Sequence, residues 1–141
     1  MCTINRWLTI ALFFAPIAAT GQETSLTVNV INANPPTGTV EVTLFDSAES
    51  FLKTATAQYP CDPGENGRCT SRFVDMLPGE YAVVVVHDAN GNNKLDNGIL
   101  GFGAESFAYS NGAKNPLFGR ARFEDARIRV EGETEIEIDL D

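Results

Sequence analysis

Apolar and polar residues alternate along much of the chain from residue 26 onward, and such alternation predicts strands with one buried face. Residues 26–31 alternate leucine and valine with polar residues and end on isoleucine. Residues 40–44 repeat the alternation, and the proline-containing stretch 34–38 between them predicts a turn. We therefore expect two antiparallel strands at the start of the fold.

The strongest apolar run spans residues 81–86 and has no polar face. A strand buried on both sides is normally central in its sheet or covered by another element. Pro78 and Gly79 precede the run and predict a type II turn in which Gly79 takes a positive φ. His87, the only histidine, continues one face of the run. We expect it to be a hydrogen-bonded residue at the strand end, with a metal-binding or proton-transfer role as the alternative.

The remaining alternating segments predict hairpins. Residues 55–60 and 69–76 flank a short turn-forming stretch. Residues 127–130 and 134–137 form a second candidate hairpin, in which apolar residues face each other and arginines face glutamates. Residues 46–53 break the alternation and predict one helical turn.

These short strands, with turn signals between them and no helix of ordinary length, indicate an all-β fold. The pattern predicts an antiparallel β-sandwich of about seven strands, immunoglobulin-like or prealbumin-like. Residues 97–120 show no convincing strand or helix pattern, and a loop of that length in a compact domain is usually functional or disordered. It is either a lid over one end of the core or a surface that binds a ligand.

The first 21 residues have the layout of a secretory signal peptide. One positive charge precedes an apolar run at residues 7–15, and small residues fill 16–21, so cleavage is expected after Ala19 or Gly21. The run is shorter than the roughly 20 residues of a membrane span, and an uncleaved amphipathic anchor is the alternative. We expect residues 22–141 to form a single domain in the periplasm or outside the cell, with no membrane span.

Export also guides the interpretation of Cys61 and Cys69. They bracket a turn-forming stretch, which predicts a disulfide across a hairpin tip. Their spacing is not that of a Cys-x-x-Cys redox pair.

The chain is acidic, with a formal net charge of −9. This charge disfavours nucleic acid and anionic membrane surfaces as partners. The acidic row at residues 133–141 is most simply a solvated face.

Oxygen-bearing side chains recur at alternate positions directly after the apolar run, as in the twelve-residue calcium loop. Position 6, usually glycine, is Asn93, and position 12, usually a bidentate glutamate, is Ile99. A metal-free asparagine-rich turn is the equal alternative, and any calcium bound would be held weakly, in the roughly sub-millimolar to millimolar class. The candidate ligands are Asp88, Asn90, Asn92 and Asp96, with the carbonyl position of the loop at Lys94.

Aromatic residues in the long patternless stretch supply a second set of candidates. They lie among glycine, serine and asparagine, close in sequence to the candidate calcium loop. Loops at one end of a sandwich commonly carry function. The ligand-binding candidates are His87, Phe102, Phe107, Tyr109 and Asn111.

Several short motifs occur in the order and spacing of a known family. They lie at residues 44–51, 73–83, 87–92, 109–113 and 123–126. With them the chain resembles the bacterial secreted family called domain of unknown function 2141. The resemblance implies a periplasmic or secreted sandwich domain and no known catalytic residues. Asn93, where the family usually has glycine, and the pair Cys61 and Cys69 depart from the family pattern.

Three classes of function remain. The first is a non-catalytic module that binds a glycan or an envelope protein, with calcium as its only cofactor. The second is a small hydrolase that uses His87 as acid or base beside Asp88, or a hydrolytic pair of carboxylates drawn from residues such as Glu105, Glu124 and Asp125. No G-x-S-x-G or H-E-x-x-H motif supports it. The third is a subunit that pairs sheet edges with a partner.

Overall fold

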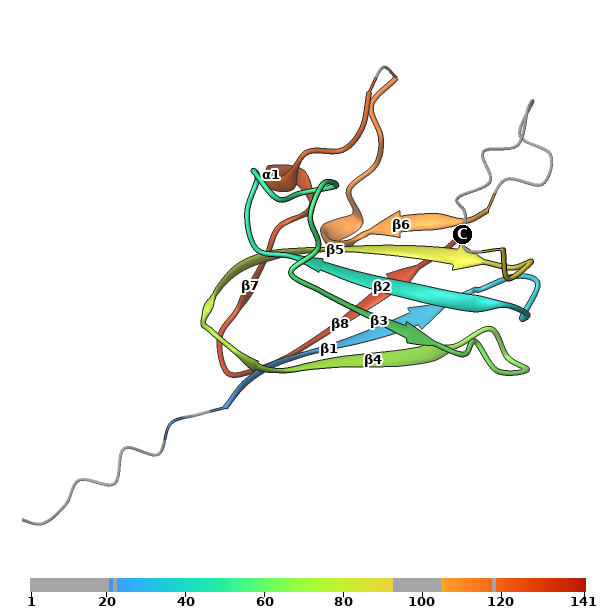
Figure 1. Cartoon of the computed structure of the whole chain (residues 1–141), viewed down its shortest axis with the longest axis horizontal. Helices are drawn as coiled ribbons and strands as arrows, with labels where there is room; N and C mark the ends of the chain where they lie inside the picture. The colour runs from blue at the N-terminus through green and yellow to red at the C-terminus, as the bar shows by residue number, and fades with distance from the viewer. Residues whose placement is uncertain (1–20, 22, 93–104, 118) are drawn as a thin grey trace, which may run out of the picture.

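The structure is a computed structural model that describes residues 21, 23–92, 105–117 and 119–141. Two β-sheets pack face to face (Figure 1), as predicted for a β-sandwich. The first sheet has the order β4 (Cys69–Met76), β1 (Thr24–Ile31), β8 (Glu133–Asp139). The second has the order β3 (Ala57–Cys61), β2 (Thr39–Phe45), β5 (Gly79–Asp88), β6 (Phe107–Tyr109), and β7 (Ile128–Val130) also pairs with β5. The described residues also contain two short helices, η2 (Ser110–Gly112) and α1 (Phe123–Ala126).

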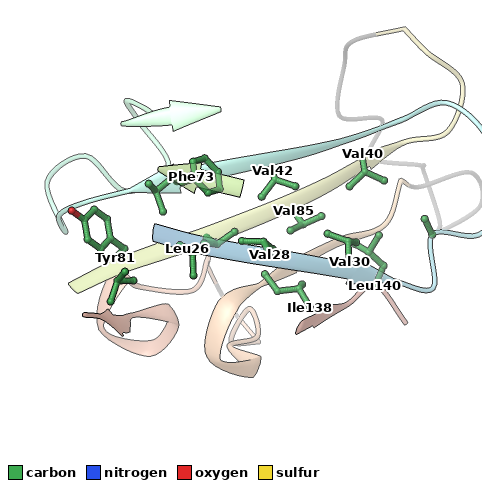
Figure 2. Close-up of a cluster of buried hydrophobic side chains, with 14 residues drawn as sticks. Leu26, Val28, Val30, Val40, Val42, Phe73, Tyr81, Val85, Ile138 and Leu140 are labelled. Atoms are coloured by element: carbon green, nitrogen blue, oxygen red, sulfur yellow. The ribbon is translucent and has the colours of Figure 1, made fainter. Parts of the chain in front are cut away.

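The predicted alternation on β1 and β2 is confirmed. The alternating residues of both strands, from Leu26 to Val30 and from Val40 to Leu44, point into the space between the sheets, where Phe73, Val85 and Ile138 join them (Figure 2). β1 and β2 do not pair, because residues 32–38 carry the chain from one sheet to the other. The two strands therefore face each other across the core.

β5 is central and buried on both faces, as predicted. Val83 and Val85 belong to the core between the sheets. Ala82 and Val84, on the opposite face, pack in a second apolar cluster with Phe51. Phe51 comes from the predicted helical turn, in which its N–H donates to the Ser47 carbonyl at 3.1 Å. The second cluster explains why residues 81–86 have no polar face.

The corner before β5 differs from the predicted type II turn. Gly79 does not take a positive φ, because it already pairs with Val130 as the first residue of β5. The positive φ falls instead on Asp75, at 54°, where the register of β4 against β1 shifts. The Tyr81 hydroxyl donates to the Leu77 carbonyl at 2.8 Å and fixes this corner. Burial raises the pKa of Tyr81, and the carboxylate of Asp46 raises it further.

Both predicted hairpins are wrong. β3 and β4 lie in different sheets, and so do β7 and β8; β8 instead runs parallel to β1. Alternation specifies which face of a strand is buried, but both sheets of a sandwich bury one face, so the pattern does not assign a strand to a sheet. The expected pairing of Arg129 with Glu135 is absent in the described residues, where Arg129 bonds Glu131.

The predicted disulfide is present but has a different role. Cys61 and Cys69 are bonded, with 5.8 Å between their Cα atoms. Because β3 and β4 are the edges of different sheets, the bond joins the two sheets along one side of the sandwich (Figure 1).

The described part of the stretch 97–120, which is residues 105–117 and 119–120, contains a strand that the sequence did not predict. Residues 107–109 form edge strand β6, paired with β5 through Val84, Val85 and Val86. Residues 97–104 lie outside the described residues.

Candidate functional site

The candidate calcium loop begins at the end of β5 and is described as far as Asn92. Asp88 is buried, and its Oδ1 accepts the N–H groups of Gly91 and Asn92 at 2.7 and 3.2 Å. The Oδ1 of Asn90 accepts the Asn92 N–H at 3.0 Å. These bonds hold the loop in a tight curl, the side-chain-to-backbone pattern expected of aspartate and asparagine in turns.

Lys94 and Asp96 lie outside the described residues. Among the residues that are described, no group of three or more histidine, cysteine, aspartate or glutamate side chains is arranged to hold a metal.

The loop between β1 and β2 packs directly against this curl. Gly38 has a φ of +76°, and a Cβ atom there would come within 1.9 Å of the Asp88 carbonyl oxygen. The Thr37 hydroxyl donates to the Ala89 carbonyl at 3.2 Å. Glycine is thus required at position 38 for both its backbone conformation and the close approach of the chain.

His87 is a bonded residue at the strand end, as expected. Its side chain is 1% exposed, and its Nε2 lies 2.8 Å from the Thr37 carbonyl oxygen. A carbonyl oxygen only accepts, so Nε2 carries the proton and donates it. The His87 backbone N–H donates to the Ser106 carbonyl oxygen at 2.8 Å.

A pocket of about 390 Å³ adjoins His87, Asn90 and Glu105. Glu105 is the single carboxylate among its described lining residues. Glu124 and Asp125 lie on α1 and do not line it. The arrangement therefore brings together one imidazole, already bonded through Nε2, and one carboxylate.

A larger groove of about 490 Å³ is lined by residues of β6 and of the end of β8. The C-terminus lies close to β6 (Figure 1). Phe107 and Tyr109 lie on one wall and Ile138 on the other. The Phe107 side chain is 39% exposed, whereas Tyr109 is buried beneath it. Their rings meet edge to face, with 5.7 Å between centroids and an interplanar angle of 81°. Phe107 thus presents a supported aromatic surface.

Asn115 is held in one orientation beside these rings. Its Oδ1 accepts the Tyr109 hydroxyl at 2.9 Å and the Ala121 N–H at 3.0 Å. With the amide oxygen occupied twice, the amide nitrogen is directed elsewhere as a fixed donor. Burial raises the pKa of Tyr109, so its hydroxyl stays protonated and keeps donating to Asn115.

The groove carries more negative than positive charge. Glu137, Asp139 and Asp141 line it together with Lys114. Asp139 Oδ1 accepts the Asp141 N–H at 3.0 Å and the Asn32 amide at 2.8 Å. These two hydrogen bonds lower the pKa of Asp139, so the carboxylate stays ionised under mildly acidic conditions.

The predicted ligand-binding residues divide between different places. Phe107 and Tyr109 share the groove, whereas His87 lies in the separate pocket. Asn111 lines neither of them, and its amide donates to the Asp125 carbonyl at 3.1 Å, bracing α1. Phe102 falls outside the described residues.

Sequence reasoning missed Lys114, Asn115 and the acidic residues of the groove. The acidic row at residues 133–141 predicts only a solvated face, because alternation alone does not show that β8 ends opposite β6. The proximity of Asn115 to aromatic residues in sequence was the one available signal.

Comparison with known proteins identifies the family of this chain. None of the helices in the described part of the chain is long and apolar enough to span a membrane. No curated protein and no solved structure matched the sequence. A family model described as an uncharacterised protein conserved in bacteria, DUF2141, matches residues 28–138. That match covers most of the chain and both sheets, and the protein therefore belongs to the DUF2141 family.

Proposed function

We propose that this protein is an exported, non-catalytic binding module of the bacterial envelope, and that the groove between β6 and β8 binds a carbohydrate. The observation that carries the proposal is the exposed Phe107 ring, supported by Tyr109 and flanked by hydrogen-bonding side chains. Export is supported by the layout of residues 1–21 and by the Cys61–Cys69 disulfide, a bond typical of oxidising compartments.

A sugar ring matches both components of the groove. A pyranose offers a face of C–H bonds that packs on an aromatic ring, and hydroxyl groups around its rim. Asn115 and Lys114 are donors and the carboxylates are acceptors for those hydroxyls. The volume of about 490 Å³ lies within the range of about 300–1,000 Å³ of small-molecule sites. A neutral sugar also avoids the repulsion that an anionic ligand would meet beside Glu137, Asp139 and Asp141.

A second part of the proposal concerns the loop that begins at Asp88. We propose that it binds calcium weakly, through the side chains of Asp88, Asn90, Asn92 and Asp96 and the carbonyl of Lys94. The curl of the loop supports this, because Asp88 and Asn90 already draw its backbone around their oxygens. Bound calcium would make this loop more rigid and would take no part in catalysis.

The glycan proposal is tested by screening neutral bacterial oligosaccharides on a microarray and measuring hits by calorimetry. Phe107→Ala should weaken binding at least about tenfold, equivalent to about 1.4 kcal/mol. Tyr59→Ala is the matched control, because Tyr59 is also a half-exposed aromatic residue but lies on the opposite side of the sandwich. The proposal would be rejected if no oligosaccharide on the microarray bound the protein. It would also be rejected if Phe107→Ala and Tyr59→Ala bound the glycan with equal affinity.

A further inference from the structure

The side of the sandwich away from β6 has its own exposed apolar groove, which the proposed function does not use. Three large hydrophobic side chains exposed in the described residues line it: Tyr59 (48%), Val74 (57%) and Leu77 (77%). Clustered exposed apolar residues on a protein surface mark interaction sites, whereas scattered ones need no explanation.

The groove opens between the two sheets. β3 contributes Tyr59, β4 contributes Val74, and both strands are sheet edges that run along the same side of the molecule (Figure 1). Its floor is the core itself, because Leu44, Phe73 and Tyr81 all belong to the main apolar cluster. The centroids of the Tyr59 and Phe73 rings are 5.1 Å apart, so the two rings pack together and support this wall of the groove.

The size of the groove limits what it accepts. Its volume of about 290 Å³ lies just below the usual range of small-molecule pockets, about 300–1,000 Å³. One or two apolar side chains of a partner fit there, packing on core residues from outside.

The sheet edges on either side are poor templates for strand addition. Pro60 in β3 has no N–H to donate. The register shift in β4 and the positive φ of Asp75 interrupt the regular edge just beside the groove. Recognition here therefore depends on side chains rather than on extension of a sheet.

Charge indicates the kind of partner. Asp46 and Asp75 line the groove, and no lysine or arginine is among its lining residues. A second copy of this chain, with a formal net charge of −9, would meet like charge. We propose that the groove between β3 and β4 docks an extended segment of a partner protein in which leucine or phenylalanine alternates with lysine or arginine.

The probe for this proposal is a labelled short peptide that alternates lysine with leucine and phenylalanine. A second peptide with glutamate in place of lysine serves as comparison. Binding to the disulfide-intact protein is measured by fluorescence anisotropy at low and high salt. The basic peptide should bind and the acidic one should not, and high salt should weaken binding because exposed charges are screened.

Two pairs of variants locate the binding. Leu77→Ser should weaken it at least about tenfold, whereas Leu117→Ser, which changes a side chain 97% exposed and outside the groove, should not. Asp75→Asn keeps the residue's shape and should weaken binding, whereas Glu124→Gln on α1 should not.

Several results would overturn the inference. These are failure of the basic peptide to bind, equal binding of the acidic peptide, and equal affinity of Leu77→Ser and Leu117→Ser. Sedimentation that reveals a dimer abolished by Leu77→Ser would show that a second copy occupies the groove instead. Each readout is independent of glycan binding at β6.

Discussion

Single polar side chains fix the geometry of the groove at β6. Asn115 accepts two hydrogen bonds that hold the segment after η2, and Asp139 connects the end of β8 to the turn after β1 through Asn32. Asn32 takes a φ of 61°, a conformation that asparagine tolerates better than most residues. The hydrogen bonds of Asn115 and Asp139 therefore hold together segments that are distant in sequence.

Asp139 should make stability depend on pH in a defined direction. Its pKa is lower in the folded protein than the usual 3.8, chiefly through the Asp141 N–H. Its stabilising contribution is therefore fully present above the unfolded pKa and is lost as pH falls through the folded pKa. Asp139→Asn should lower Tm at neutral pH, and the Tm difference from wild type should narrow below about pH 4.

The control for this prediction is Glu49→Gln, which removes an exposed carboxylate from the turn after β2. Its Tm difference from wild type should stay small and nearly constant over the same pH series. A Tm difference for Asp139→Asn that does not change with pH would contradict the assignment.

At the scale of elements, the Cys61–Cys69 disulfide joins the edge strands of the two sheets, β3 and β4. The pattern of residues located β1, β2 and β5 correctly, since β1 and β2 alternate over one buried face and β5 is apolar on both faces. It missed β6, because three residues within a long patternless stretch give no periodic signal. It also missed the partners of β3, β4, β7 and β8, because those depend on how the chain crosses between sheets.

Removing the disulfide should destabilise the fold without altering it. Cys61 and Cys69 are eight positions apart, and a closed loop of that length contributes about 2.5 kcal/mol in the chain-entropy treatment. The Cys61→Ser/Cys69→Ser double variant should lose that free energy of unfolding in urea titrations. Reduction of wild type should give the same loss while leaving the double variant unchanged. Equal stability before and after reduction would contradict this.

The calcium loop gives a second element-scale prediction. Wild-type Tm should rise with calcium up to 10 mM and not with equal magnesium, because binding to the native state alone stabilises it. Asp88→Asn keeps an oxygen that accepts the Gly91 and Asn92 N–H groups but removes the charge. This variant should therefore stay folded and lose the calcium-dependent rise. A response that survives the substitution, or none in wild type, would exclude this loop as a calcium site.

At the scale of the whole molecule, the two proposed binding grooves are separate from each other. The groove beside β6 and the groove between β3 and β4 lie on opposite sides, because β3 and β4 form one pair of sheet edges and β6 and β8 the other. Asp88 ends β5, whose last residues lie at one end of the sandwich (Figure 1). The sequence was sufficient to predict a sandwich and the bonded pair Cys61 and Cys69. It was not sufficient to predict either groove, because each forms between strands from different sheets.

The most direct test of the carbohydrate proposal is to map a bound oligosaccharide on the ¹⁵N-labelled protein by NMR. Neutral oligomers of glucose and N-acetylglucosamine are suitable probes. We expect chemical-shift changes at Phe107, Tyr109, Asn115 and the end of β8, and none around Tyr59 and Leu77. Changes centred on the pocket beside His87, or no changes with any oligomer, would contradict the proposal.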